Sequence, residues 1–171
     1  YLQKLKVQQD DVFYIPAGTV HGIGAGNLIV EVQESSNLTY RLYDYDRVDK
    51  AGQKRELHLE KALAVADLKG KAAPRQPLRV LRYTPGSATE FLCRCKYFQV
   101  ERLLLNTEGK SKLAELYTGS SSFQALLCLD GEGYILTEDK EKLAYSKGNC
   151  IFIPANTGKL QLCGRSQFLK I

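Results

Sequence analysis

The 171-residue chain carries 44% hydrophobic and 25% charged residues, proportions typical of a soluble globular protein with a hydrophobic core. No run approaches the about 18 apolar residues that a membrane-spanning helix needs. The first residues, Tyr1 to Lys6, lack the apolar stretch of a signal peptide. Composition therefore predicts no membrane association.

The formal net charge is +5 at pH 7, but the basic residues are interspersed among 19 acidic ones. No basic tract marks a nucleic-acid surface. We expect no nucleic-acid partner, and the positive sign is compatible with a phosphorylated substrate.

The five cysteines are odd in number and lie mostly in apolar, strand-like stretches: Cys93, Cys95, Cys128, Cys150 and Cys163. A buried free thiol behaves as a small hydrophobic side chain. We therefore expect reduced, buried thiols and a cytoplasmic protein.

Strand-like runs rich in β-branched and aromatic residues dominate the first fifty residues, at 5–7, 12–15, 28–33 and 38–43. Gly24 to Asn27 has the composition of a hairpin turn. The pattern then becomes helical over 56–69, where Leu59, Leu63 and Ala66 recur at helical spacing before a terminating Gly70. Residues 71–77 have the composition of a linker.

Strand patterns return after the linker. They centre on Val80 and on 91–95, 98–104, 123–129, 133–136, 150–153 and 168–171. Many short strands separated by turn signals are typical of an antiparallel barrel or sandwich.

The chain also contains an internal repeat, since residues 11–21 align without gaps with residues 149–159. Ile, Pro, Ala and Thr are identical in both copies. Gly18 is matched by Asn156, and both residue types tolerate the left-handed conformation that a tight turn requires. Two similar β-barrels explain the repeat economically.

His21 ends the first copy, directly after a strand and a proline-initiated turn that would hold its backbone rigidly, as a metal ligand needs. The second copy has Lys159 at this position. A lone histidine in a turn is more often simply hydrogen-bonded, but the repeat favours one barrel with a chemical role and one with a structural role.

The two strands that follow alternate in polarity and present Glu31 and Arg41 on polar faces. Glu31 could carry a proton, and Arg41 could bind a phosphate or stabilise an enediolate. A solvent-exposed polar face explains the same alternation. His58 has no ligand-like neighbours in sequence, so we expect a surface or helix-capping residue.

Residues 12–24 and 31–47, together with Leu57 to Leu63, resemble the short bacterial type I mannose-6-phosphate isomerases. The resemblance implies an all-β protein of cupin barrels, the first of them incomplete, with a short helical connection. It places half of the catalytic barrel at 1–50, the helix and linker at 51–77, and a metal-free cupin-like barrel at 78–171.

Members of that family interconvert mannose 6-phosphate and fructose 6-phosphate through an enediol. They use one Zn²⁺ per chain, held by a glutamine, two histidines and a glutamate. By this resemblance His21 is a zinc ligand, Arg41 is catalytic and Glu31 is an acid of the pocket.

The other zinc ligands and an active-site lysine of the family lie in a preceding segment that this chain lacks. One histidine and one glutamate are too few for a stable zinc site. We therefore expect the chain alone to be inactive and to bind zinc weakly. We also expect a preceding segment or a second copy of the chain to cover its open strand edges.

Two other readings stay open. A non-catalytic cupin that binds a sugar or sugar phosphate needs no metal site. An iron-dependent cupin oxygenase needs two histidines and a carboxylate close together, and the sequence offers only His21 for that purpose.

Overall fold

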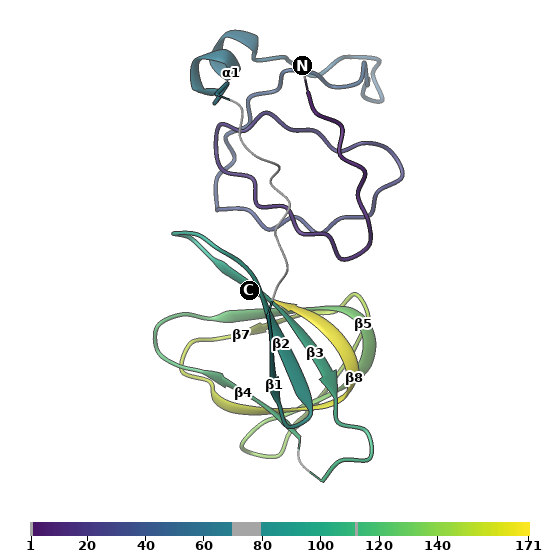
Figure 1. Cartoon of the computed structure of the whole chain (residues 1–171), viewed down its shortest axis with the longest axis vertical. Helices are drawn as coiled ribbons and strands as arrows, with labels where there is room; N and C mark the ends of the chain where they lie inside the picture. The colour runs from purple at the N-terminus through teal and green to yellow at the C-terminus, as the bar shows by residue number, and fades with distance from the viewer. Residues whose placement is uncertain (1, 70–79, 112) are drawn as a thin grey trace. The chain divides into compact units, whose positions relative to one another are not determined.

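The computed structural model describes residues 2–69, 80–111 and 113–171 (Figure 1). The chain divides into two compact units, residues 1–75 and 76–171. The expected linker, 71–77, lies outside the described residues.

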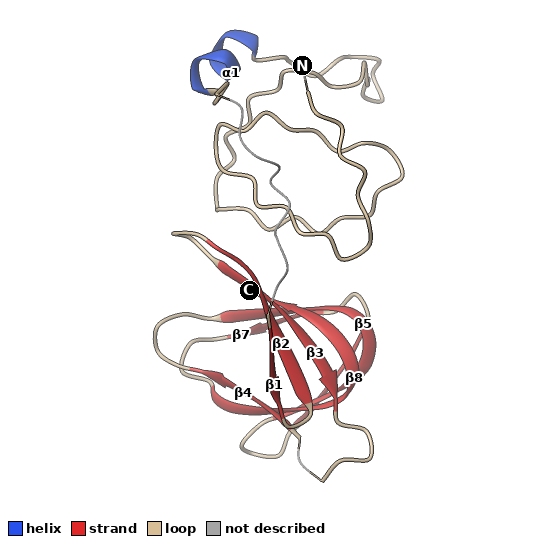
Figure 2. Ribbon diagram, in the orientation of Figure 1, coloured by secondary structure: helices blue, strands red, loops and turns tan. Residues whose placement is uncertain are grey.

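The second unit is built from eight strands: β1 (Leu81–Thr84), β2 (Ser87–Arg94), β3 (Gln99–Asn106), β4 (Ala114–Thr118), β5 (Gln124–Leu136), β6 (Lys142–Ser146), β7 (Cys150–Ile153) and β8 (Gly158–Lys170). Every pairing is antiparallel, in the order β1-β2-β3-β8-β5-β6, with β4 also on β8 and β7 also on β5 (Figure 2). The all-β prediction is confirmed.

The two long strands, β5 and β8, lie next to each other within one eight-stranded sheet, and each pairs with different further neighbours along its two halves. The first half of β8 pairs with β4 and its second half with β3. Likewise, β5 pairs with β7 through its first residues and with β6 through its last. Both strands curve along their length, so that the single sheet wraps around on itself (Figure 1).

Glycines permit the bend. A Cβ on Gly133 would lie 1.9 Å from the carbonyl oxygen of Cys163, and one on Gly131 would lie 2.0 Å from that of Arg165. The space left open is taken by the Tyr145 hydroxyl, which donates to the Cys163 carbonyl oxygen at 3.0 Å. Any side chain at these glycines would push the paired strands β5 and β8 apart.

The curved sheet encloses an apolar core contributed by both halves of the long strands and by their neighbours. Its members are Leu103, Leu105, Ala114, Leu116, Leu126, Cys128, Ile135, Tyr145, Ile153, Leu160, Leu162 and Phe168. The Phe168 ring is fully buried and meets the Tyr145 ring edge-on, with 4.9 Å between centroids. The interior of this unit is therefore mainly apolar, with a few buried polar side chains such as Thr118 and Ser166.

Strand positions in the second unit follow the sequence pattern in part. The strand expected at 150–153 is β7, with the same bounds. The segments 123–129 and 133–136 belong to one strand, β5, because the glycines between them bend the strand without ending it. The sequence prediction missed β4, β6 and the first part of β8.

In the first unit, α1 spans Leu59–Val65, shorter than the expected 56–69. The helix is therefore confirmed over part of its expected range; its buried residue is Ala62, whereas Leu59 and Leu63 are exposed. The helix ends because Ala66 takes an extended conformation; Gly70 lies outside the described residues. The described part of the chain holds no helix with the length and apolar composition of a membrane span.

None of the four strands predicted before residue 50 forms within the described residues 2–69. Val48 and Lys54 make an isolated antiparallel bridge. Gly24 to Asn27 makes a turn, with Asn27 Nδ2 donating to the Gly24 carbonyl oxygen at 3.0 Å, but no strands flank it and the predicted hairpin does not form. A strand needs a neighbour to bond its backbone groups and cover its apolar face. Without one, Leu28 and Leu38 stay exposed.

All five cysteines are free thiols, as expected, but they are not all buried. Cys128 is buried in the core of the second unit. Cys150 is exposed, because the side chains of β7 alternate and its position points away from that core.

Candidate functional site

The turn before His21 has the geometry that its sequence predicts. The Thr19 amide donates to the Pro16 carbonyl oxygen at 3.2 Å, and Gly18 takes φ +84°. In the second copy the Thr157 amide donates to the Pro154 carbonyl at 3.4 Å, and Asn156 takes φ +63°. The prediction that Gly18 and Asn156 share a left-handed conformation is confirmed.

The end of α1 and the residues just after it contact this turn. The Asp67 amide donates to the Gly18 carbonyl oxygen at 2.8 Å. A Cβ on Gly18 would lie only 2.9 Å from the Val65 carbonyl oxygen. Glycine is needed here both for its positive φ and for this close approach.

His21 is exposed, and its Nδ1 lies 2.9 Å from the Thr19 carbonyl oxygen. A carbonyl oxygen only accepts, so Nδ1 is the protonated nitrogen in this contact. In the neutral ring the lone pair then belongs to Nε2. Metal-binding histidines are commonly oriented in this way, with one nitrogen donating to a backbone carbonyl and the other free to coordinate.

Tyr45 steadies the residues just after His21. Its hydroxyl donates to the Ile23 carbonyl oxygen at 3.4 Å, and a Cβ on Gly22 would lie 3.2 Å from the same hydroxyl. Tyr45 and Asp46 both have positive φ, +54° and +53°, which turns the chain back toward this segment.

The turn that carries Tyr45 is fixed by Asp44, a buried carboxylate held by two arginines. Arg47 Nη2 lies 2.5 Å from Asp44 Oδ1, and Arg55 Nε donates to Oδ2 at 2.7 Å. Arg55 also pairs with Oδ1 through Nη2. The hydrogen bonds from Arg55, followed by those from Arg47, hold the pKa of Asp44 far below its usual range.

Arg41 is held by residues 56–58. Its amide donates to Nδ1 of His58 at 3.1 Å, and the His58 amide donates to the Arg41 carbonyl oxygen at 2.8 Å. Its guanidinium donates through Nη1 to the Glu56 carbonyl oxygen at 2.9 Å. Sequence reasoning missed the role of His58, because the two residues lie 17 positions apart and only the fold brings them together.

Glu31 is exposed, and the described residues show no hydrogen bond or ion pair for its side chain. His21, Glu31 and Arg41 make no such contact with one another in this part of the chain. Over residues 2–69, 80–111 and 113–171, no three histidine, cysteine or acidic side chains gather as a metal site would require. The structure thus positions His21 and Arg41 separately and leaves Glu31 unanchored.

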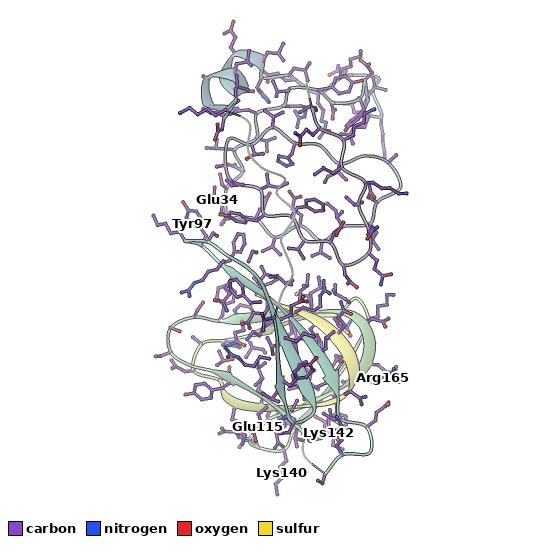
Figure 3. All side chains as sticks on the ribbon, viewed as in Figure 1. Glu34, Tyr97, Glu115, Lys140, Lys142 and Arg165 are labelled. Atoms are coloured by element: carbon purple, nitrogen blue, oxygen red, sulfur yellow. The ribbon has the colours of Figure 1, made fainter. Side chains whose placement is uncertain are left out.

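The second copy of the repeat has a different environment. Lys159, aligned with His21, lies on β8 and pairs through Nζ with Glu115 Oε1 at 2.6 Å, with Glu115 labelled in Figure 3. The sheet to which β8 belongs encloses the apolar core on its other face. The aligned position therefore contributes an exposed ion pair on the outside of the second unit.

Residues 87–171 match the family model described as "Mannose-6-phosphate isomerase, cupin domain". Mannose-6-phosphate isomerase ManA of Bacillus subtilis is 34% identical over 166 residues, which cover 97% of this chain and 50% of ManA. The chain belongs to the mannose-6-phosphate isomerase family.

Two further comparisons agree with the family assignment. The mannose-6-phosphate isomerase of Streptococcus mutans is 34% identical over 163 residues, 95% of this chain and 48% of that protein. The crystal structure of the mannose 6-phosphate isomerase from Bacillus subtilis superimposes with a TM-score of 0.67 at 27% identity, covering 79% of this chain and 40% of that one. The cupin prediction is confirmed for this family member.

The chain spans about half the length of the curated family members it matches. The roles of His21, Glu31 and Arg41 remain predictions.

Proposed function

We propose that the protein to which this chain belongs interconverts mannose 6-phosphate and fructose 6-phosphate through an enediol. The observation that carries this proposal is the 34% identity to ManA over 97% of the chain, because it includes the first unit with its candidate residues as well as the cupin domain. The geometry at His21 and Arg41 supports it.

His21 fits the part of a zinc ligand. Its Nδ1 is engaged by the Thr19 carbonyl, so Nε2 is available for coordination. One imidazole does not make a zinc site, and the described residues offer no cluster that would complete one. A bound Zn²⁺ supplies a Lewis acid that polarises substrate oxygens.

Arg41 and Glu31 have complementary parts in the proposed reaction. Arg41 keeps a fixed positive charge, suited to a phosphate or to the negative charge of an enediolate. Glu31 is a carboxylate that can accept and return the proton moved between neighbouring carbons. Its exposure means that a further segment must enclose it before it can act in a dry site.

We also propose that a preceding segment completes the first unit, as the resemblance implies. The unformed strands and the exposed Leu28 and Leu38 support this idea, because both leave backbone and apolar groups without partners. A second copy of the chain is the alternative way to cover them. In either case the 171-residue chain alone is inactive and retains little zinc.

The cytoplasmic location is proposed on the cysteines, of which Cys128 is buried in a reduced, apolar setting. The absence of membrane and nucleic-acid partners is likewise a prediction from composition.

The test compares the 171-residue chain with the full polypeptide encoded by its complete reading frame. Isomerase activity and metal content are measured on each by a coupled assay and by mass spectrometry of bound metal. We expect activity and one zinc per chain only in the longer protein, and loss of both on His21→Ala. The matched control is Lys159→Ala, the aligned position in the second unit, which should retain both.

A contrary result has a clear meaning. If the natural product is the 171-residue chain and holds no metal, the isomerase proposal fails. A cupin that binds a sugar phosphate without turning it over would then take its place, and calorimetry with mannose 6-phosphate would detect that binding.

A further inference from the structure

His58 and Arg41 are joined by a reciprocal pair of hydrogen bonds. The His58 amide donates to the Arg41 carbonyl oxygen at 2.8 Å, and the Arg41 amide donates to the His58 ring at 3.1 Å. The main chain of Arg41 is thus bonded on both its polar groups. A third bond, from Arg41 Nη1 to the Glu56 carbonyl, fixes one edge of the guanidinium.

The contact defines the tautomer of His58. A backbone amide only donates, so Nδ1 accepts through its lone pair and the neutral ring carries its proton on Nε2. That nitrogen lies 3.7 Å from Glu56 Oε2. The Tyr40 ring lies edge-on to the His58 ring, with 6.3 Å between the ring centroids.

The ring does not serve the helix that it precedes. His58 occupies the N-cap position of α1, but its side chain makes no capping hydrogen bond. The His58 side chain is only 20% exposed, so it packs against the protein and does not point into solvent. A side chain at the N-cap position normally accepts a hydrogen bond from the first turn of its helix; the His58 side chain instead accepts one from the Arg41 amide.

We propose that His58 is a positioning residue for Arg41. Its Nδ1 fixes the Arg41 backbone, and the adjacent Glu56 carbonyl fixes the guanidinium, so that the remaining guanidinium nitrogens are presented in one direction. The functional consequence rests on the proposed isomerase, in which Arg41 contacts the substrate. The structural consequence, a fixed tautomer and a fixed Arg41, holds for the chain regardless of its activity.

The first experiment needs no variant. Two-bond ¹⁵N–¹H correlation spectra of the intact chain report the protonation of each ring nitrogen. We expect an unprotonated Nδ1 and a protonated Nε2 for His58, and the opposite arrangement for neutral His21, whose Nδ1 donates to Thr19. A protonated Nδ1 in neutral His58 would overturn the proposal.

The second experiment separates positioning from mere stability. His58→Asn places the amide Oδ1 where Nδ1 stood and keeps the acceptor, while His58→Leu has similar bulk and no acceptor. Losing one such hydrogen bond lowers kcat of the complete enzyme about ten-fold in the leucine variant. The asparagine variant should recover most of that loss, with KM little changed in either.

Arg41→Ala provides the decisive background. It retains the backbone amide but removes the guanidinium, so adding His58→Leu should change the residual kcat by less than about two-fold. An equal loss with and without the Arg41 side chain would show that His58 acts through general stability and would overturn the positioning role. So would failure of asparagine to rescue a folded leucine variant.

The two proposals fail in different ways. If the complete wild-type protein has no isomerase activity, the proposed function fails, and the ring spectra alone decide the His58–Arg41 contact. If Arg41→Ala abolishes activity while both His58 variants retain it in full, the function survives and the positioning role is wrong. Lys61→Ala, on the exposed face of α1, is the control for nonspecific effects on the helix.

Discussion

The two units of this chain carry related turns on very different foundations. In the second unit, sixteen buried apolar residues lie on or between paired strands, from Ala88 to Leu169. Among the described residues of the first unit, the corresponding set is Ala62 alone. The first unit is instead organised by hydrogen bonds and ion pairs around Gly18, Arg41 and Asp44.

The difference shows that one short sequence motif can form the same turn with and without flanking strands. The proline turn has the same hydrogen bond and the same left-handed residue in both copies, although only the second is flanked by strands. Local backbone chemistry fixes the turn, whereas a strand depends on neighbours that the motif does not contain.

The largest contrast is expected from truncating buried and exposed side chains. Phe168→Ala opens a cavity in the core and should lower the free energy of unfolding of the second unit by about 3–5 kcal/mol. Leu63→Ala, at a 59% exposed side chain of the first unit, should cost less than about 0.5 kcal/mol. Urea denaturation followed by far-ultraviolet circular dichroism measures both. Comparable losses would contradict the division into a core-stabilised and a polar-stabilised unit.

A glycine pair tests how α1 supports the turn before His21. Gly18 and Gly26 both have positive φ, but only Gly18 is near another backbone group, the Val65 carbonyl oxygen. Gly26→Ala should cost about 1 kcal/mol from backbone strain alone. Gly18→Ala adds the steric contact and should cost about 2–3 kcal/mol. Amide exchange of Asp67 should rise only in the Gly18 variant; equal effects would show that α1 does not hold the turn.

The units should also respond to opposite ends of the pH scale. The pKa of Asp44 is lowered by Arg55 and Arg47, so its stabilisation is present above the unfolded pKa, about 4, and is lost as the pH falls below it. Burial raises the pKa of the Tyr145 hydroxyl, so its stabilisation is present below the unfolded pKa, about 10, and is lost as the pH rises beyond it.

We therefore expect nuclear magnetic resonance signals of the first unit to collapse first in acid and those of the second unit first in base. Asp44→Asn should remove the acid sensitivity and Tyr145→Phe the base sensitivity. Simultaneous loss of both units at either extreme would contradict the comparison.

The smallest effect is expected from Lys159→His, which gives the second copy the side chain of the first. It removes an exposed ion pair with Glu115, worth less than about 1 kcal/mol. Because the described residues gather no three histidine, cysteine or acidic side chains as a metal site would require, no zinc should be gained. Zinc binding by this variant would mean that the histidine alone distinguishes the two copies.

Much of the second unit was predictable from the sequence because its strands are ordinary alternating segments. The bounds of β7 and the left-handed Asn156 followed from residue types alone. The continuity of β5 could not be predicted. Glycines such as Gly133 are typical of strand ends in sequence, but in the structure Gly133 lies inside β5 and permits the close approach of β8.

The site was less predictable. His21 was found through the repeat, and its free Nε2 follows from a contact two residues away. The part played by His58 depends on a contact across 17 residues, for which the sequence holds no periodic signal. The strands predicted around Glu31 fail because period-two alternation reports a preference for pairing and carries no information on whether a partner is at hand.

The bend shared by β5 and β8 also governs how the second unit comes apart. Because β5 and β8 pair with each other and between them carry β3, β4, β6 and β7, the sheet cannot lose this central pair and keep its other pairings. Unfolding of this unit should then be a single all-or-none event, with the slowest-exchanging amides at both ends of β5 and β8 protected to the same free energy. The continuous central pair thereby makes one cooperative body out of the whole curved sheet.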